Sequence, residues 1–207
     1  MLPDLNDKNM NVEVMAKEAL KDEKILSELL DNLKTKNETV RYNSSKVLNL
    51  LSEKNPEVLY PKWDYFVELL STDHTYWKLS VIPIIANLVR IDLENKFEAI
   101  FEKFFGLLND RSVIPAAWIA ANSGKIAKAK PRLQARVTNE LLSIDRTHHD
   151  PERKDLIKAG AIESFAEYYE EAADKKKILE FVKKQLECKS PKTRKIAKEF
   201  LEKWSSE

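Results

Sequence analysis

Apolar residues recur at intervals of three and four along most of the chain, and no stretch shows the sustained alternation of a β-strand. The pattern is interrupted at Pro, Asn, Asp and Ser, and four prolines stand where helical first turns begin: Pro56, Pro131, Pro151 and Pro191. The helices predicted from this pattern span residues 11–20, 22–34, 38–53, 57–71, 74–91, 94–108, 112–129, 132–145, 152–172, 175–188 and 192–204. The chain is therefore expected to be all-α.

The predicted helices form pairs, and one position recurs in the second helix of each pair. The residues at this position are Val40-Arg41, Trp77-Lys78, Ile114-Pro115 and Thr193-Arg194, with Lys154-Asp155 in a degenerate fourth pair. Seven residues earlier, a leucine is expected to close the first helix of the pair inside the core: Leu33, Leu70, Leu107 and Leu186. A single helix pair cannot bury its apolar face, and stacking on neighbouring pairs does so.

Three segments carry a resemblance to a known repeat family: NETVRYNSSKVLNLL, DHTYWKLSVIPIIANLV and SPKTRKIAKEFLEKW. They resemble the second helix of the HEAT repeat, in the HEAT/armadillo class, with an Asp or Asn cap, a Val-Arg-like pair, a small residue and a leucine-rich face. The resemblance implies an α-α superhelix, or solenoid, of about five HEAT-like helical hairpins. Residues 22–207 are then one array, and residues 1–21 are an N-terminal segment with a capping helix.

Two positions depart from the family pattern. Pro115 stands where a basic residue is expected, so a ladder of Arg–Asp contacts between neighbouring repeats would be interrupted there. Pro83 lies inside an apolar helix, where its ring removes one backbone hydrogen bond.

The second helices near the middle of the chain, around residues 77–89 and 113–121, are apolar on more than one face. A helix that is apolar all round is expected to be buried all round. One interpretation is an apolar groove that receives a partner helix or peptide. The other is that the array fills this space itself, for example with the helix 11–20.

Composition excludes several classes of protein. Three glycines cannot supply either of the glycine-rich loops that hold nucleotide phosphates, so Rossmann and P-loop chemistry is excluded. Cys188 is the single cysteine, the N-terminus lacks a signal-peptide pattern, and no apolar run approaches a membrane span. A cytoplasmic protein without a membrane partner is therefore expected.

The net charge of +1 conceals an asymmetry between the two halves of the chain. Residues 1–110 carry 14 Lys and Arg against 19 Asp and Glu, whereas residues 111–207 carry 21 against 15. Within the basic half, five cations surround the turn at Pro131 with no acid between them: Lys125, Lys128, Lys130, Arg132 and Arg136. These residues are the candidate binding site, and phosphates or an acidic protein surface are its candidate ligands. The alternative is a solvated hairpin tip.

The other residues that could be catalytic or metal-binding can also be explained by a purely structural role. HEAT-like arrays include DNA glycosylases that remove alkylated bases, and Asp73 near Trp77 or Asp110 near Trp118 could supply the carboxylate and aromatic wall. Both aspartates, however, stand where helix caps are expected, and both tryptophans fall on core positions. The remaining residues with candidate chemistry are His74, His148, His149 and Asp150, expected in linkers rather than at a metal, and Cys188, expected to be inert.

The sequence therefore predicts a non-enzymatic protein-binding scaffold of the HEAT type. Its partner would be a protein or peptide, with no cofactor, no metal ion and no small-molecule substrate. The alternative is a nucleic-acid-binding array related to DNA repair, of which a glycosylase is the extreme case.

Overall fold

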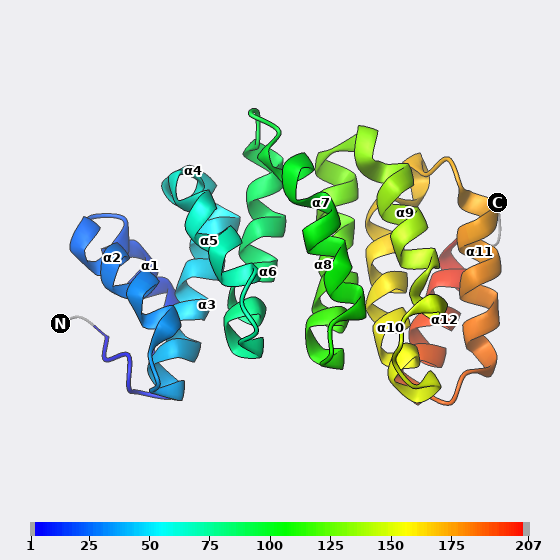
Figure 1. Ribbon diagram of the computed structural model, residues 1–207, viewed down its shortest axis with the longest axis horizontal. Coiled ribbons are helices and arrows are strands. Elements are labelled where there is room, and N and C mark those ends of the chain that lie inside the picture. Colours follow the sequence, from blue (N-terminus) through cyan, green and yellow to red (C-terminus); the bar gives the residue numbers. More distant parts are fainter. Residues whose placement is uncertain (1–2, 205–207) are drawn as a thin grey trace. The chain divides into compact units, whose positions relative to one another are not determined.

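The computed structural model describes residues 3–204, and every regular element in that range is helical, as predicted (Figure 1). The chain divides into two compact units, Met1–Glu94 and Asn95–Glu207. The prediction of one continuous array over residues 22–207 stays a prediction, because the placement of one unit relative to the other is not fixed.

The first unit contains helices α1 (Val12–Ala19), α2 (Glu23–Asp31), α3 (Glu38–Lys54), α4 (Pro56–Leu59), α5 (Trp63–Leu70) and α6 (Thr75–Leu88). The helix predicted over 57–71 is divided into α4 and α5 by a 3-10 turn, Tyr60–Lys62. Pro61 occupies the middle of that turn and has no N–H for the α-helical hydrogen bond, which explains the interruption.

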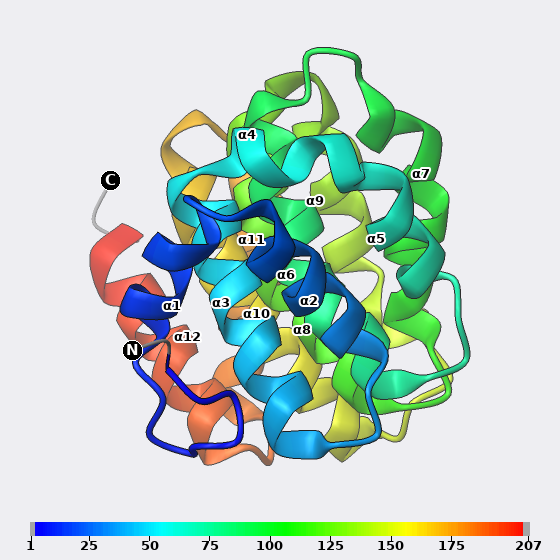
Figure 2. The ribbon, with the colours of Figure 1, turned by 90° about the vertical axis from the view of Figure 1, so that its left-hand side faces the viewer.

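In the first unit, α3 and α6 pack side by side, and α5 packs on α6 (Figures 1 and 2). Helix α1, which one interpretation placed in a central groove, packs on α3 and α2. Leu48, Phe66 and Ile85 are fully buried where these helices meet. Asn87 of α6 also donates a hydrogen bond to the hydroxyl of Ser52 on α3 at 2.8 Å, so the contact includes polar groups that are paired.

The second unit contains helices α7 (Lys96–Gly106), α8 (Val113–Ala129), α9 (Gln134–Leu142), α10 (Pro151–Tyr168), α11 (Lys175–Lys184) and α12 (Pro191–Trp204). Helix α10 packs on α8 along one side and on α12 along the other, and α9 packs on α8. Three phenylalanines of α7, Phe97, Phe101 and Phe104, are fully buried and meet edge to face. The second helices α8, α10 and α12 thus form one layer of this unit (Figure 1).

Helices α8 and α10 approach so closely that two glycines are needed between them. A Cβ atom on Gly160 would lie 2.9 Å from the backbone nitrogen of Ala121, and one on Gly124 would lie 2.7 Å from the carbonyl oxygen of Ser164. The Ser164 hydroxyl accepts a hydrogen bond from the Gly124 N–H at 2.9 Å and donates one to the Ala120 carbonyl at 2.5 Å. Because Ala120 O and Gly124 N are partners in an uninterrupted α-helix, the α10 hydroxyl bridges a backbone pair of α8.

The N-caps of the second helices give the register of the helix pairs. They are Asn37, His74, Ser112, Asp150 and Ser190, which are 37, 38, 38 and 40 residues apart. The third pair is therefore shifted by one residue from the sequence alignment, and Pro115, not Ile114, is equivalent to Val40 and Trp77.

The shift changes which leucines lie in the core. Leu33 and Leu70 are buried as expected, but Leu107 is half-buried and Leu108 takes the core position. At the last pair, Leu186 is 38% exposed and Gln185 is buried instead. Both first helices end in a 3-10 turn, Leu107–Asn109 and Gln185–Glu187. The first helix of the first pair also ends in such a turn, Asn32–Lys34, and Leu33 stays buried there, so the turn alone does not explain the change.

The cap positions also correct the expectation for the two aspartates. Asp73 and Asp110 precede the true caps, His74 and Ser112. The carboxylate of Asp110 accepts a hydrogen bond from the Ser112 N–H at 2.8 Å, so Asp110 stabilises the turn before the helix.

The arginines of the first and last pairs are equivalent, as predicted, because Arg41 and Arg194 each donate a hydrogen bond to the carbonyl six residues earlier.

We expect Leu108→Ala to destabilise the protein by about 2–5 kcal/mol, because the fully enclosed side chain would leave a cavity. Leu107→Ala is the matched control, since it removes the same atoms from a half-buried position. Urea unfolding of both variants measures the difference. Equal losses would show that the register given by the N-caps is wrong.

We expect Gly160→Ala to cost about 1–3 kcal/mol, because the new methyl group would overlap the backbone of α8. Gly106→Ala is expected to change the stability in the opposite direction. Apart from its chain neighbours and its own helix backbone, no atom lies within 4 Å of its Cβ position. Replacing a helical glycine there is expected to stabilise by about 0.5–1 kcal/mol. Thermal unfolding monitored by circular dichroism compares the two, and a stabilising Gly160→Ala would contradict the close approach of α8 and α10.

Candidate binding surfaces

The five cations predicted as a binding site lie on either side of the turn between α8 and α9. Lys125 and Lys128 lie in the last turns of α8, Lys130 is its C-cap, Arg132 lies in the 3-10 turn, and Arg136 lies on α9. The structure brings them into two groups, each of which faces acidic or amide groups of a neighbouring helix.

The first group faces α7. Arg132 forms an ion pair with Glu98, and Arg136 forms one with Glu102 at 2.7 Å. The guanidinium of Arg136 also covers the ring of Phe101 at 4.0 Å. Lys130 donates a hydrogen bond to the side-chain oxygen of Asn95 at 3.0 Å. Much of the positive charge of the turn is therefore neutralised by the helix beside it.

The second group faces α10. Partial burial raises the pKa of the Glu167 carboxyl, and the charges of Lys125 and Lys128 act in the opposite direction. The two lysines therefore lie close enough to Glu167 to stabilise its ionised form. The basic turn therefore contains two ion pairs, and its lysines lie near amide or acidic groups of neighbouring helices, rather than forming a row of free cations.

A second candidate surface is an exposed apolar row on α8 and α10. Ile114 and Trp118 lie one turn apart on α8 and are 47% and 42% exposed, while Leu156 on α10 is 43% exposed. Trp118 and Leu156 each lie six residues after the N-cap of their helix, and Gly160, one turn after Leu156, lies against Ala117 and Ala121. Trp118 and Leu156 therefore occupy equivalent positions on neighbouring helices, and Ile114 lies one turn before Trp118.

The exposure of Trp118 corrects the expectation that it is a core residue. The small residues of α8 take the contact with α10, and Ile119 and Ala120 take the buried positions. Trp118 lies between these two faces and is too large for the narrow interface. Of the two interpretations that the sequence left open for residues 113–121, the open apolar face agrees with the exposure of Ile114 and Trp118.

Next to this row lies a cavity of about 510 Å³ with a basic lining. It is formed by the start of α8 and the segment that leads into α10, and its lining residues are Arg111, Ser112, Val113, Ile114, His148, His149, Asp150 and Arg153. Asp150 is the single acid in this lining. Within residues 3–204, neither Arg111 nor Arg153 forms a side-chain ion pair or hydrogen bond, so both guanidinium groups are available to a ligand.

Hydrogen bonds fix the tautomers of the two histidines. Nδ1 of His148 lies 2.7 Å from the side-chain oxygen of Asn109, and because that oxygen accepts, Nδ1 carries the proton. Nε2 of His149 lies 3.2 Å from the carbonyl oxygen of Leu108 and is the donor for the same reason. Burial, and then the neighbouring His148, lower the pKa of His149. His149 is thus the neutral, structural member of the pair.

The first unit has its own exposed aromatic residues, each covered by a cation. Arg41 lies over the ring of Tyr76 at 5.1 Å, and Lys46 lies over the ring of Tyr42 at 4.3 Å. Further along α6, residues 81–89 are all buried. The apolar face that the sequence predicted around residues 77–89 is therefore closed, except at its first turn.

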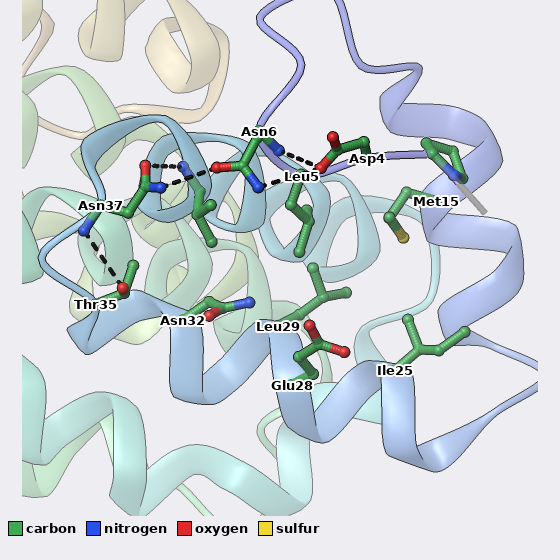
Figure 3. Close-up of a pocket in the computed structure, with 12 residues that line it drawn as sticks. Asp4, Leu5, Asn6, Met15, Ile25, Glu28, Leu29, Asn32, Thr35 and Asn37 are labelled. Atoms are coloured by element: carbon green, nitrogen blue, oxygen red, sulfur yellow. Dashed lines mark hydrogen bonds between the residues drawn. The ribbon is translucent and has the colours of Figure 1, made fainter.

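Another cavity, of about 470 Å³, lies between α1, α2, α3 and the N-terminal segment (Figure 3). Asn6 of that segment accepts a hydrogen bond from the Asn37 amide at 2.9 Å, and Leu5 points towards Leu29. The buried Asn43 amide donates to the carbonyls of Leu5 and Asp7. These bonds attach the segment to α3. The charged residues in the lining, Asp4 and Glu28, are both acidic.

The remaining candidates do not assemble into a reactive centre. Asp73 is exposed and the ring of Trp77 stacks on His74 at 4.5 Å, so the side chains proposed for base excision are not joined by any described contact. Cys188 is half-buried, with its thiol 3.6 Å from the Ser190 carbonyl. In residues 3–204, no His, Cys, Asp and Glu side chains gather in a group able to hold a metal ion. No helix in this range is both long and apolar enough to cross a bilayer.

Sequence reasoning missed Arg153 and Leu156, and it named His148 and His149 without joining them to an arginine. The only signal was the regular spacing of the N-caps, which places residues 112 and 150 at equivalent ends of adjacent helices. No family model, curated protein or solved structure matches this chain.

We expect the double variant Glu98→Gln, Glu102→Gln to raise the affinity for a DNA duplex several-fold at low salt, because it frees Arg132 and Arg136 from their partners. The gain should disappear as salt rises, since phosphate contacts release counterions. Fluorescence anisotropy measures both effects. The control, Glu163→Gln with Glu180→Gln, changes the net charge equally at two exposed positions elsewhere. An equal gain in this control would show that the basic turn has no particular role.

Proposed function

We propose that this chain is a helical-repeat binding scaffold of the HEAT type, and that its second unit binds a segment of a partner protein. The repeat architecture is supported by the N-cap spacing of 37 to 40 residues and by the packing of successive second helices within each unit. The observation that carries the function is the exposed row of Ile114, Trp118 and Leu156 beside a basic cavity.

The row costs free energy in the unbound protein, because large apolar side chains remain in contact with water. Singly exposed apolar residues are common, but three within the first turns of two adjacent helices are a typical feature of an interaction surface. Tryptophan is also among the residues that contribute most to binding energy at protein interfaces.

The neighbouring cavity supports a partner with a definite chemistry. The apolar row favours an aliphatic or aromatic contact, and Arg111 and Arg153 favour a negative group close to it. The geometry is better suited to recognition than to catalysis: Nε2 of His149 is held by a backbone carbonyl, and Asp150 is the single carboxylate of the lining.

Nucleic-acid binding through the basic turn is the second candidate. The surplus of Lys and Arg in the second half of the chain favours it, but the ion pairs of Arg132 and Arg136 reduce the charge available to phosphates. We therefore rank it below the protein scaffold.

We expect Trp118→Ser to reduce partner binding at least tenfold with little loss of stability, because the side chain is half outside the core but central to the row. The immobilised protein would be incubated with lysate of the source organism at high salt after nuclease treatment. Proteins bound by the wild type and lost with Trp118→Ser would be identified by mass spectrometry.

Leu186→Ser is the matched control, because Leu186 is similarly exposed in the same unit but lies outside the row. A partner that binds both variants equally, or neither, does not use the surface. Circular dichroism verifies that both variants are folded.

A further inference from the structure

The cavity at the start of α8 and α10 has the features of a site for a doubly charged anion. Two guanidinium groups, Arg111 and Arg153, line it from different segments of the chain, and no described side chain pairs with either of them. Arginine presents parallel N–H donors that match the oxygens of a phosphate, and two arginines can bind it from two sides.

His148 adds an oriented ring nitrogen to the cavity lining. Its Nδ1 proton is held by Asn109, so the ring is oriented and Nε2 is the nitrogen left for a ligand. The backbone N–H of His148 also donates to the same Asn109 oxygen at 2.8 Å, which fixes the backbone of the residue. With the proton on Nδ1, Nε2 carries a lone pair and can accept a hydrogen bond from a protonated oxygen of the ligand.

The size and charge of the cavity favour one phosphate group rather than a nucleic-acid strand. A strand needs a series of cations along its backbone, whereas two arginines line this open cavity of about 510 Å³ from different segments of the chain. The cations that could have extended the surface, Arg132 and Arg136, are paired with acids.

We propose that this cavity binds a phosphomonoester carried by the partner segment, such as a phosphorylated side chain, while the row of Ile114, Trp118 and Leu156 holds the apolar residues beside it. The inference rests on the proposed function for the identity of the carrier. The binding of the phosphate itself can be measured without the partner.

The experiment is a titration of the 15N-labelled full chain with inorganic phosphate and with O-phosphoserine, at constant ionic strength, with acetate and chloride as control anions. We expect saturable shifts of amide signals around residues 111–114 and 148–153 with both phosphates and not with the control anions. Arg111→Gln and Arg153→Gln should each weaken binding about tenfold or more, the effect of losing a hydrogen bond to a charged group.

Arg146→Gln is the matched control, because it removes the same charge from a neighbouring exposed position outside the cavity lining. Arg153→Lys keeps the charge and the fold but not the paired donors, and we expect it to bind several-fold more weakly than the wild type. An absence of saturable shifts, or an equal loss in Arg146→Gln, would overturn the proposal. Displacement of phosphate by a single-stranded oligonucleotide with a gain of affinity that grows with its length would assign the cavity to nucleic acid instead.

Failure of this inference and failure of the proposed function can be told apart. Trp118→Ser should bind inorganic phosphate as the wild type does, because Trp118 does not line the cavity. Phosphate binding without Trp118-dependent capture of a partner would support the anion site and contradict the scaffold surface. Partner capture that is unchanged by phosphatase treatment and by Arg153→Gln would contradict the phosphate site alone.

Discussion

Helices α8 and α10 of the second unit can form the observed contact only because both lack side chains where they meet. Gly124 and Gly160 remove the atoms that would keep the backbones apart, and the hydroxyl of Ser164 supplies the hydrogen bonds that so short a distance allows. The contact also directs the larger residues of α8. Because the interface accepts only small groups, Trp118 is left at its edge, where it forms the apolar row with Leu156 on the next helix.

The two basic surfaces of the second unit differ chiefly in which groups surround their cations. Around the α8–α9 turn, the acids of α7 lie at the spacing that matches Arg132 and Arg136, and the charges compensate each other. At the start of α8 and α10, Asn109 and the Leu108 carbonyl hold the histidines, and Asp150, the single acid of the lining, forms no described ion pair with Arg111 or Arg153. The second surface therefore has more capacity for an external anion, although it contains fewer cations.

The all-α class and the helix pairs follow from local periodicity, which the sequence displays directly. The sequence could not reveal the one-residue shift at Leu108, because Leu107 and Leu108 are adjacent leucines and either fits the apolar pattern. The ion pairs of the basic turn join residues about 34 positions apart. They depend on which faces of α7 and α9 meet, and the apolar pattern of each helix alone does not determine that. The cavity has the same origin, since Arg111 and Arg153 come from different helix pairs.

The bridge made by Ser164 has a mechanical consequence for the second unit. A hydroxyl that bonds both Ala120 and Gly124 resists sliding of α10 along α8, because any displacement of a fraction of a helical turn would break two buried hydrogen bonds. Helices joined only by aliphatic side chains can shift with a smaller loss, as their contacts are not directional. A partner that binds at Trp118 and displaces α8 would therefore be expected to displace α10 with it, because the two helices are held at a fixed offset.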